Sequence, residues 1–256
     1  MRKLSLLLTV CVFISLPVMA KAWNDQTAAE LRDILASEQR SDEHRARDAN
    51  RKPLETLAFF GLRNDMSVVE MIPGKGWYTR ILAPLLRDKG KLYLSIGTRR
   101  LEPALFEKGI ISKSDIVGKV EGFRQTDMPG FIFDIDSVDM QVQNVDMVLT
   151  FRNVHNFSAG ARKLINEAAF AALKPGGIYG IIDHTKRHME AFNETTWRRI
   201  DPVLIIKEAL DAGFEFEAYS DLHAVAADEL VHDTLHEAVK TNSDRFTLKF
   251  RKPLKP

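Results

Sequence analysis

Two closely spaced glycines follow an acidic residue in the stretch Glu70-Met71-Ile72-Pro73-Gly74-Lys75-Gly76-Trp77-Tyr78-Thr79. The β-rich run 67–71 predicts a strand that ends here, and the apolar spacing of residues 79–87 predicts a helix that begins here. The glycines allow a tight turn that brings the backbone close to a ligand, and the helix start offers unpaired N–H groups. This order of elements indicates a nucleotide-binding turn, and a plain glycine turn without a ligand is the alternative.

After this turn, strand-like and helix-like segments alternate along the chain. Such alternation predicts parallel strands joined by crossover helices, which is an α/β doubly wound sheet. The expected strands are 91–96, 119–124, 146–151, 178–183, 214–219 and 245–250, and the expected helices are 159–173, 202–212 and 228–239. Before the turn, helix-spaced apolar residues over 23–48 predict an N-terminal helical extension. The predicted domains are a signal peptide over 1–20, the helical extension over 21–53 and one α/β domain over 54–256.

The first twenty residues differ in kind from the rest. Arg2 and Lys3 precede a nearly charge-free apolar run over 4–16, and small residues near Ala20 offer a cleavage point. This pattern is typical of a secretory signal peptide, and the run is shorter than the ~20 residues that span a bilayer. We therefore expect export to the periplasm and no stable membrane span after cleavage. The only cysteine, Cys11, leaves with the signal, and a chain without thiols suits an oxidising compartment.

The composition excludes several classes of protein. Hydrophobic residues make up 45% of the chain, which is enough for a packed core and excludes disorder. A single cysteine excludes a disulfide framework and a cysteine-based zinc site. Lys and Arg number 36 against 35 Asp and Glu, and loss of residues 1–20 makes the formal charge −1, so no nucleic-acid partner is expected. The oligomeric state is not indicated.

Two histidine pairs, His184/His188 and His232/His236, have the i, i+4 spacing that places both rings on one helical face. Zinc sites use this spacing, but neither pair shows the His-Glu-x-x-His pattern. A polar helix surface explains the pairs more simply, so no metal ion is expected.

The chain over residues 45–256 resembles the class I S-adenosylmethionine-dependent methyltransferases, and more narrowly a bacterial group of predicted methyltransferases that carry signal peptides. The resemblance rests on Arg47–Pro53, Glu70–Tyr78, Thr150–Asn156, Leu173–Gly177, Asp183-His184, Asp244–Phe246 and Phe250–Pro253. It implies a Rossmann-like, seven-stranded sheet whose last strand, 245–250, inserts antiparallel between its neighbours. It also implies S-adenosylmethionine as the cofactor, with a methyl acceptor that the sequence does not identify.

The resemblance further implies which residues contact the cofactor. Glu70, Gly74 and Gly76 are expected at its methionine end, with Pro73 and Tyr78 of the same turn as further cofactor-binding candidates. Asp127 is a candidate hydrogen-bond acceptor for the adenine amine, if the third strand ends near residue 125.

Candidate catalytic residues follow the fourth and fifth expected strands. Asn153 and His155 come after the fourth strand, and His184 ends the fifth. Methyl transfer needs an aligned nucleophile and sometimes a base, and histidine titrates near neutral pH. His155 is the preferred base or substrate-orienting group, and its alternative role is to cap the helix near Ser158 or to form a hydrogen bond with a loop. Structural hydrogen bonding is the alternative for His184.

Two features leave other functions open. The second strand is followed by Ser95-Ile96-Gly97-Thr98-Arg99-Arg100, which has no carboxylate for the ribose hydroxyls before Glu102. Arg99 and Arg100 would suit the 2′-phosphate of NADP, but the third glycine of that fingerprint is replaced by Thr79. An exported protein that keeps the fold and binds another small ligand, or has no catalytic role, is the second alternative. The charged cluster over 47–52 is either a lid or an ion-paired helix end.

Overall fold

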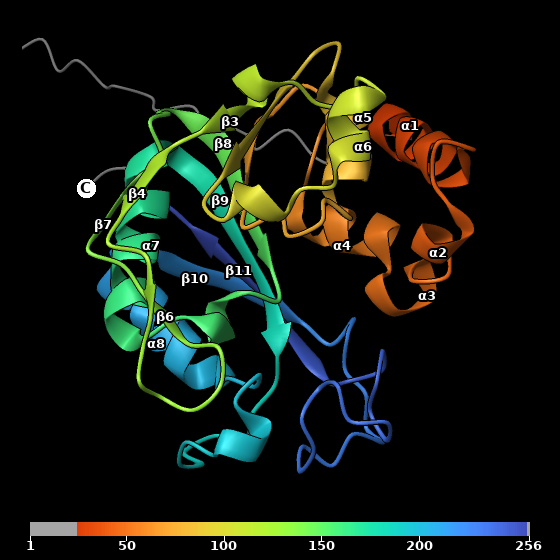
Figure 1. Cartoon of the computed structure of the whole chain (residues 1–256). Helices are drawn as coiled ribbons and strands as arrows, with labels where there is room; N and C mark the ends of the chain where they lie inside the picture. Colours follow the sequence, from red (N-terminus) through yellow and green to blue (C-terminus); the bar gives the residue numbers. More distant parts are fainter. Residues whose placement is uncertain (1–24, 255–256) are drawn as a thin grey trace, which may run out of the picture.

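The computed structural model describes residues 25–254, so the predicted signal peptide over 1–20 lies outside the described residues. A seven-stranded sheet forms the centre, with the strand order β10-β11-β9-β8-β1-β2-β3 (Figure 1). The strands are β1 Ser67–Met71, β2 Lys91–Ser95, β3 Ile116–Val117, β8 Val145–Phe151, β9 Leu173–His184, β10 Glu215–Ser220 and β11 Arg245–Arg251. Strand β11 lies between β10 and β9 and runs antiparallel to both, whereas the other neighbours pair in parallel. The predicted doubly wound α/β sheet with an antiparallel last strand is confirmed.

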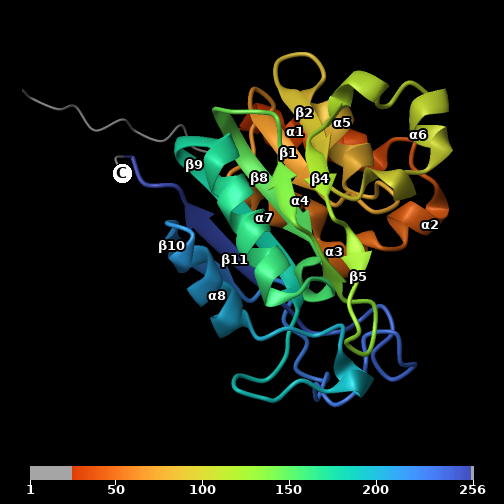
Figure 2. The ribbon, with the colours of Figure 1, turned by 60° about the vertical axis from the view of Figure 1, so that its left-hand side comes forward.

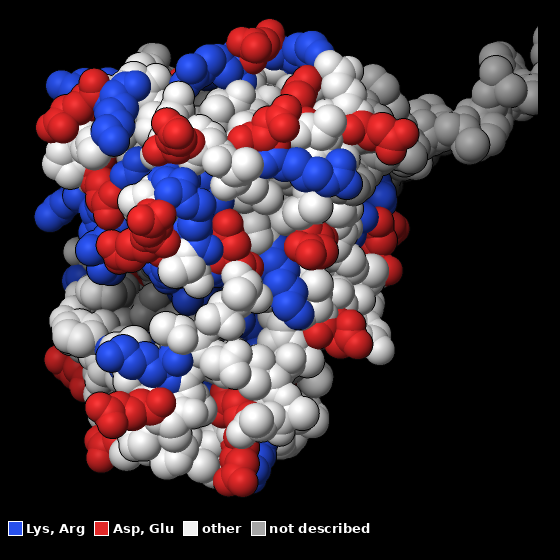
Figure 3. All heavy atoms as spheres, turned by 90° about the vertical axis from the view of Figure 1, so that its right-hand side faces the viewer, with Lys and Arg blue, Asp and Glu red and all other residues white. Residues whose placement is uncertain are grey.

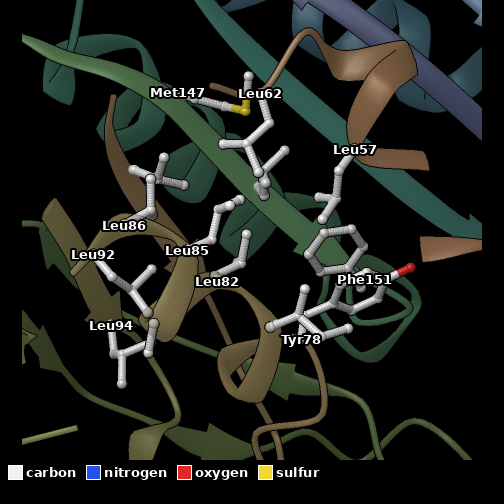
Figure 4. Close-up of a cluster of buried hydrophobic side chains, with 14 of the residues drawn as sticks. Leu57, Leu62, Tyr78, Leu82, Leu85, Leu86, Leu92, Leu94, Met147 and Phe151 are labelled. Atoms are coloured by element: carbon white, nitrogen blue, oxygen red, sulfur yellow. The ribbon is translucent and has the colours of Figure 1, made fainter. Parts of the chain in front are cut away.

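Helices cover both faces of this sheet (Figures 1 and 2). One face carries α1 Asp25–Ala36, α4 Pro53–Phe60 and α5 Thr79–Leu86, and the other carries α7 Ala159–Ala172 and α8 Pro202–Asp211. Each face has its own buried apolar cluster. In the first cluster, Leu82, Leu85 and Leu86 of α5 are buried together with Leu92 and Leu94 of β2 (Figure 4). Each buried leucine contributes roughly 1.5–3 kcal/mol, so α5 holds the loop before it firmly against the sheet.

The predicted N-terminal helical extension is present. After α1 come α2 Asp42–Arg45 and α3 Asp48–Arg51, which lead into α4. Arg40, only 2% exposed, joins these helices, because its guanidinium donates to both carboxylate oxygens of Asp48 at 2.8 and 2.5 Å. The extension contacts the loop that precedes α5, close to the centre of the sheet.

Two sequence predictions were wrong. Residues 119–124 do not form the third strand of the sheet, because β3 ends at Val117 and Gly118 takes a positive φ of 91°. The chain beyond builds two small antiparallel pairs instead, in which β4 Lys119–Glu121 pairs with β7 Ser137–Asp139 and β5 Arg124–Gln125 pairs with β6 Phe133–Asp134. Residues 228–239 form turns rather than a helix, since Leu230 has a φ of 63°, which interrupts helical hydrogen bonding.

The segments 185–201 and 221–244 extend beyond the carboxyl end of β9 (Figure 1). The first leaves β9, and the second returns from β10 to the start of β11. Together they cover the edge of the sheet at which ligands bind in folds of this kind. Within residues 25–254, no helix is both long and apolar enough to cross a membrane.

Candidate active site

The carboxyl ends of three neighbouring strands share an unusual backbone conformation. Ile72, Ile96 and Arg152 directly follow β1, β2 and β8, and their φ angles are 54°, 56° and 62°. Each such left-handed residue costs of order 1–3 kcal/mol, and strain of this kind gathers at functional sites. No sequence pattern predicts this conformation, because isoleucine disfavours it. Asn153 ties two of these loops together, since its side-chain amide donates to the carbonyl of Ile72 at 3.0 Å.

The two glycines of the loop between β1 and α5 face different surroundings. Gly74 has a φ of 59°, and a Cβ added there would meet nothing within 4 Å. Gly76 has a φ of 86°, and its added Cβ would lie 2.4 Å from Leu105 Cδ1. Gly76 therefore permits close packing on Leu105, whereas Gly74 leaves open space beside the loop. Pro73, which precedes both glycines, is buried. Because an added side chain has open space at Gly74 but not at Gly76, only Gly74 is suited to test whether a ligand approaches the loop.

Glu70, near the end of β1, is a buried acid, 2% exposed. Thr79 Oγ1 donates to its Oε2 at 2.6 Å. Burial raises the pKa of Glu70 to about 8, although the Thr79 hydrogen bond and the charge of Arg51 oppose this shift. The group is therefore mostly neutral at pH 7. A cationic group placed beside it would favour the carboxylate and lower this pKa.

The N-terminal extension packs against the same loop. Trp77 Nε1 donates to the carbonyl of His44 at 3.2 Å, and the guanidinium of Arg51 lies 4.4 Å from the Trp77 ring. Tyr78 stacks on Phe151 with ring centroids 3.6 Å apart, and its hydroxyl donates to the Arg51 carbonyl at 3.3 Å. The ring and hydroxyl of Tyr78 are thus engaged within the protein, and its contact with a cofactor stays a prediction.

The charged cluster over 47–52 divides into two kinds of residue. Asp48 pairs with Arg40, and Lys52 Nζ donates to the carbonyl of Leu222 at 2.7 Å, as expected of a docked helix end. Arg47 and Arg51 pair with no carboxylate of the described residues. Arg47 and Arg51 consequently leave positive charge without a paired carboxylate at this edge of the sheet.

His155 is held by a buried carboxylate. It lies in a short 3-10 helix after β8, and its Nδ1 is 2.6 Å from Asp183 Oδ1. Asp183 is fully buried and also accepts the backbone N–H of His155 at 3.1 Å and that of His184 at 2.7 Å. With Nδ1 fixed on the carboxylate, Nε2 is left for a ligand, and no hydrogen bond joins it to the described residues. The capping alternative for His155 is wrong, because Ser158 Oγ itself accepts from Ala161 N at 3.0 Å.

His155 and His184 line separate cavities. His155 lies beside Trp197 and Phe157 in a cavity of about 570 Å³. His184 lines a cavity of about 210 Å³. Its Nδ1 is 2.8 Å from Ser243 Oγ, and burial, followed by the charges of His155 and Arg152, holds its pKa well below the usual range. A neutral, hydrogen-bonded His184 matches the structural alternative, whereas a catalytic role for His155 stays a prediction.

Asp127 is not placed as the sequence suggested. It is exposed in the loop that joins β5 to β6, and the third strand of the sheet ends at Val117 rather than near residue 125. The condition on which an adenine contact rested is therefore not met. Glu102, the first acid after β2, accepts from Arg80 Nη2 at 2.5 Å, which leaves the ribose position without a free carboxylate.

The residues considered for NADP or a metal ion do not form a buried pair like that of His155 and Asp183. Arg99 and Arg100 are exposed at the end of β2. His188 Nδ1 lies 2.8 Å from Asp201 Oδ2, and the rings of His232 and His236 stack 4.0 Å apart outside any helix. In the part of the chain that the structure describes, no three His, Cys, Asp or Glu residues gather as metal ligands.

Comparison with known proteins identifies the fold. No protein-family model matches the sequence, and no curated protein does. Among solved structures, a SAM-dependent methyltransferase from Aquifex aeolicus superposes with a TM-score of 0.54 at 15% identity, covering 88% of this chain and 98% of that one. The [4+2]-cyclase SpnF superposes with a TM-score of 0.50 at 15% identity, covering 89% of this chain and 93% of that one. The chain thus has the Rossmann-like fold of class I methyltransferases, a fold that also serves a cyclase.

Proposed function

We propose that the protein is an S-adenosylmethionine-dependent methyltransferase. The observation that carries this proposal is the pairing of an open glycine loop with a buried acid at the end of the central strand. In this proposal, the open space beside Gly74 takes the methionine end of the cofactor, and the buried Glu70 accepts a hydrogen bond from its ammonium group. The fit is good at this end, whereas the ribose end lacks a carboxylate because Glu102 is paired with Arg80.

A matched pair of glycine variants tests the placement of this site. Gly74 and Gly109 both have positive φ, 59° and 62°, and neither has an atom within 4 Å of an added Cβ. Gly74→Val and Gly109→Val should therefore lose similar stability from backbone strain. We expect Gly74→Val alone to lose affinity for S-adenosylhomocysteine, by at least about 100-fold, because its side chain fills the ligand's path. Equal affinity in the two variants, measured by calorimetry, would place the cofactor elsewhere.

The proposed mechanism assigns His155 as the base. S-adenosylmethionine, when bound, supplies an activated methyl group. In this mechanism, Asp183 fixes Nδ1 of His155, and Nε2 takes a proton from an acceptor bound in the larger cavity, which His155 lines. A positioned base typically contributes ~10²–10⁴-fold to rate, whereas alignment and exclusion of water fall to the walls of the cavity.

Replacement of His155 separates catalysis from binding. In His155→Gln, release of S-adenosylhomocysteine in the presence of a small-molecule extract should fall at least about 100-fold, while binding of that product stays near the wild-type value. His236→Gln, at an exposed position, is the matched control and should keep full turnover. Unchanged turnover in His155→Gln would remove His155 from the mechanism.

We further propose that the chain belongs to the bacterial group that carries signal peptides and that it works in the periplasm, with domains over 21–53 and 54–256. The basic start and apolar run of residues 1–20 support export. The mass of the protein recovered from periplasm and cytoplasm tests it, since export requires that residues 1–20 be absent from the periplasmic form.

A second function is favoured by one observation. The absence of a free carboxylate after β2 weakens ribose anchoring, and a small-ligand protein or a non-methylating enzyme of this fold would show that absence too. Such a protein would not bind S-adenosylhomocysteine.

A further inference from the structure

A cavity of about 210 Å³ is lined by an excess of positive charge. Five cationic side chains line it from three parts of the chain. They are Arg47 and Arg51 of the N-terminal extension, Arg152 after β8, and Lys240 and Arg245, which lie before and at the start of β11. No carboxylate of residues 25–254 lines this cavity. On the face that carries the N-terminal extension, Lys and Arg side chains gather beside a hollow (Figure 3).

These cations are poorly compensated by the protein itself. Arg51 and Arg245 are buried, and Arg47 and Arg152 are half-buried. Among the described residues, none of the five forms a salt bridge. Arg51 Nε is buried and has no hydrogen-bond partner within residues 25–254, and the Arg245 side chain donates to the carbonyls of Ser243 and Asn50. Burying positive charge without an anion is costly, so this arrangement indicates a ligand of opposite charge.

The neighbouring acids do not remove the excess. Asp183 and Asp244 oppose part of the positive charge, since they raise the pKa of Arg152 and of Arg245, but they are two carboxylates against five cations. Glu70, near Arg51, is mostly protonated at pH 7. Burial lowers the pKa of Arg152 to about 10, and the charges of Arg47 and Arg245 add to this shift.

We propose that this cavity binds an oxyanion, the phosphate or carboxylate group of a ligand other than the cofactor. Guanidinium groups bind both kinds of oxyanion through paired, charge-assisted hydrogen bonds. The cavity is smaller than the roughly 300–1,000 Å³ of whole-ligand pockets, so it takes the charged end of a ligand and leaves the remainder outside. This site does not depend on methyl transfer.

Inorganic phosphate is the probe for this site. Thermal unfolding of the chain over 21–256 is followed in phosphate and in chloride at equal ionic strength, so that screening is the same in both. Phosphate should raise the unfolding midpoint in a saturable manner. The half-saturating concentration should rise about 10-fold in Arg152→Gln and in Arg47→Gln, the second of which loses no hydrogen bond of the folded chain. Arg99→Gln, at an exposed arginine outside the cavity, should behave as wild type.

Two results would overturn the proposal on the phosphate arm. One is an unfolding midpoint that rises equally in phosphate and in chloride. The other is a half-saturating phosphate concentration that rises as much in Arg99→Gln as in Arg152→Gln. A second arm distinguishes the cofactor's own carboxylate as the source. Saturating phosphate and the Arg152→Gln change should both leave the affinity for S-adenosylhomocysteine unchanged, whereas competition between phosphate and S-adenosylhomocysteine would assign the cavity to the cofactor. The phosphate arm stands even where S-adenosylhomocysteine does not bind.

Discussion

Glu70→Gln is expected to stabilise the protein at pH 8 and to weaken its affinity for S-adenosylhomocysteine. The native acid has a pKa of about 8, above its ordinary value of 4.5 in the unfolded chain. Above pH 4.5 the unfolded state therefore binds fewer protons than the native state, so stability falls as the pH rises towards 8. This group alone should cost the wild type roughly 3 to 4 kcal/mol between pH 5 and pH 8. Glutamine does not titrate, so the Glu70→Gln variant does not lose this unfolding free energy as the pH rises.

Urea unfolding at pH 5 and pH 8 measures this effect. The difference in unfolding free energy between Glu70→Gln and wild type should grow in favour of the variant as the pH rises, by roughly 3 kcal/mol. Glu102→Gln is the control, since Glu102 is 34% exposed and paired with Arg80, and its loss should give no gain at pH 8. A constant difference across this range would show that Glu70 is ionised in the folded chain.

The second large effect concerns the segment over 221–244. Arg199 and Asp228, 0% and 1% exposed, form a buried ion pair with Nη2–Oδ2 at 2.9 Å, and Asp228 also accepts the backbone N–H of Asp244 at 2.7 Å. Arg199 further donates to the carbonyl of His232 at 2.7 Å, which fixes the segment to the chain after β9. Asp228→Asn leaves a buried cation unpaired, which should cost about 3 to 5 kcal/mol of unfolding free energy.

A nearby ion pair serves as the comparison. Arg198 and Asp233 join the same two segments, but their side chains are 24% and 18% exposed. Asp233→Asn should therefore cost about 1 kcal/mol or less in urea unfolding. Similar losses in the two variants would contradict the view that burial makes Arg199–Asp228 the anchor of this segment. Loss of the anchor should also abolish the phosphate response, because the segment forms one wall of the basic cavity.

The elements with strong periodicity were predictable from the sequence, and those fixed by tertiary contacts were not. Strand β1 was predicted residue for residue, and α5 and α7 to within one residue, because each is rich in apolar residues that are buried in the core. The failures at 119–124 and 228–239 have local causes. Gly118 and Leu230 adopt positive φ there, and the packing that imposes this leaves little trace in hydrophobic spacing.

The candidate site was predictable in outline only. The glycine turn and the histidine after β8 were found from their places in the chain. The Asp183–His155 contact and the arginine cavity bring together residues far apart in sequence, so no local pattern reveals them. The different surroundings of Gly74 and Gly76 likewise became visible only with Leu105 in place.

The most direct test is a calorimetric titration of the chain over 21–256 with S-adenosylhomocysteine, with NADP as a control, at pH 7 in two buffers of different ionisation enthalpy. The account predicts micromolar binding of S-adenosylhomocysteine alone, with release of a proton as Glu70 ionises beside the ligand's ammonium group. Absence of S-adenosylhomocysteine binding, or binding of NADP in its place, would contradict the methyltransferase assignment.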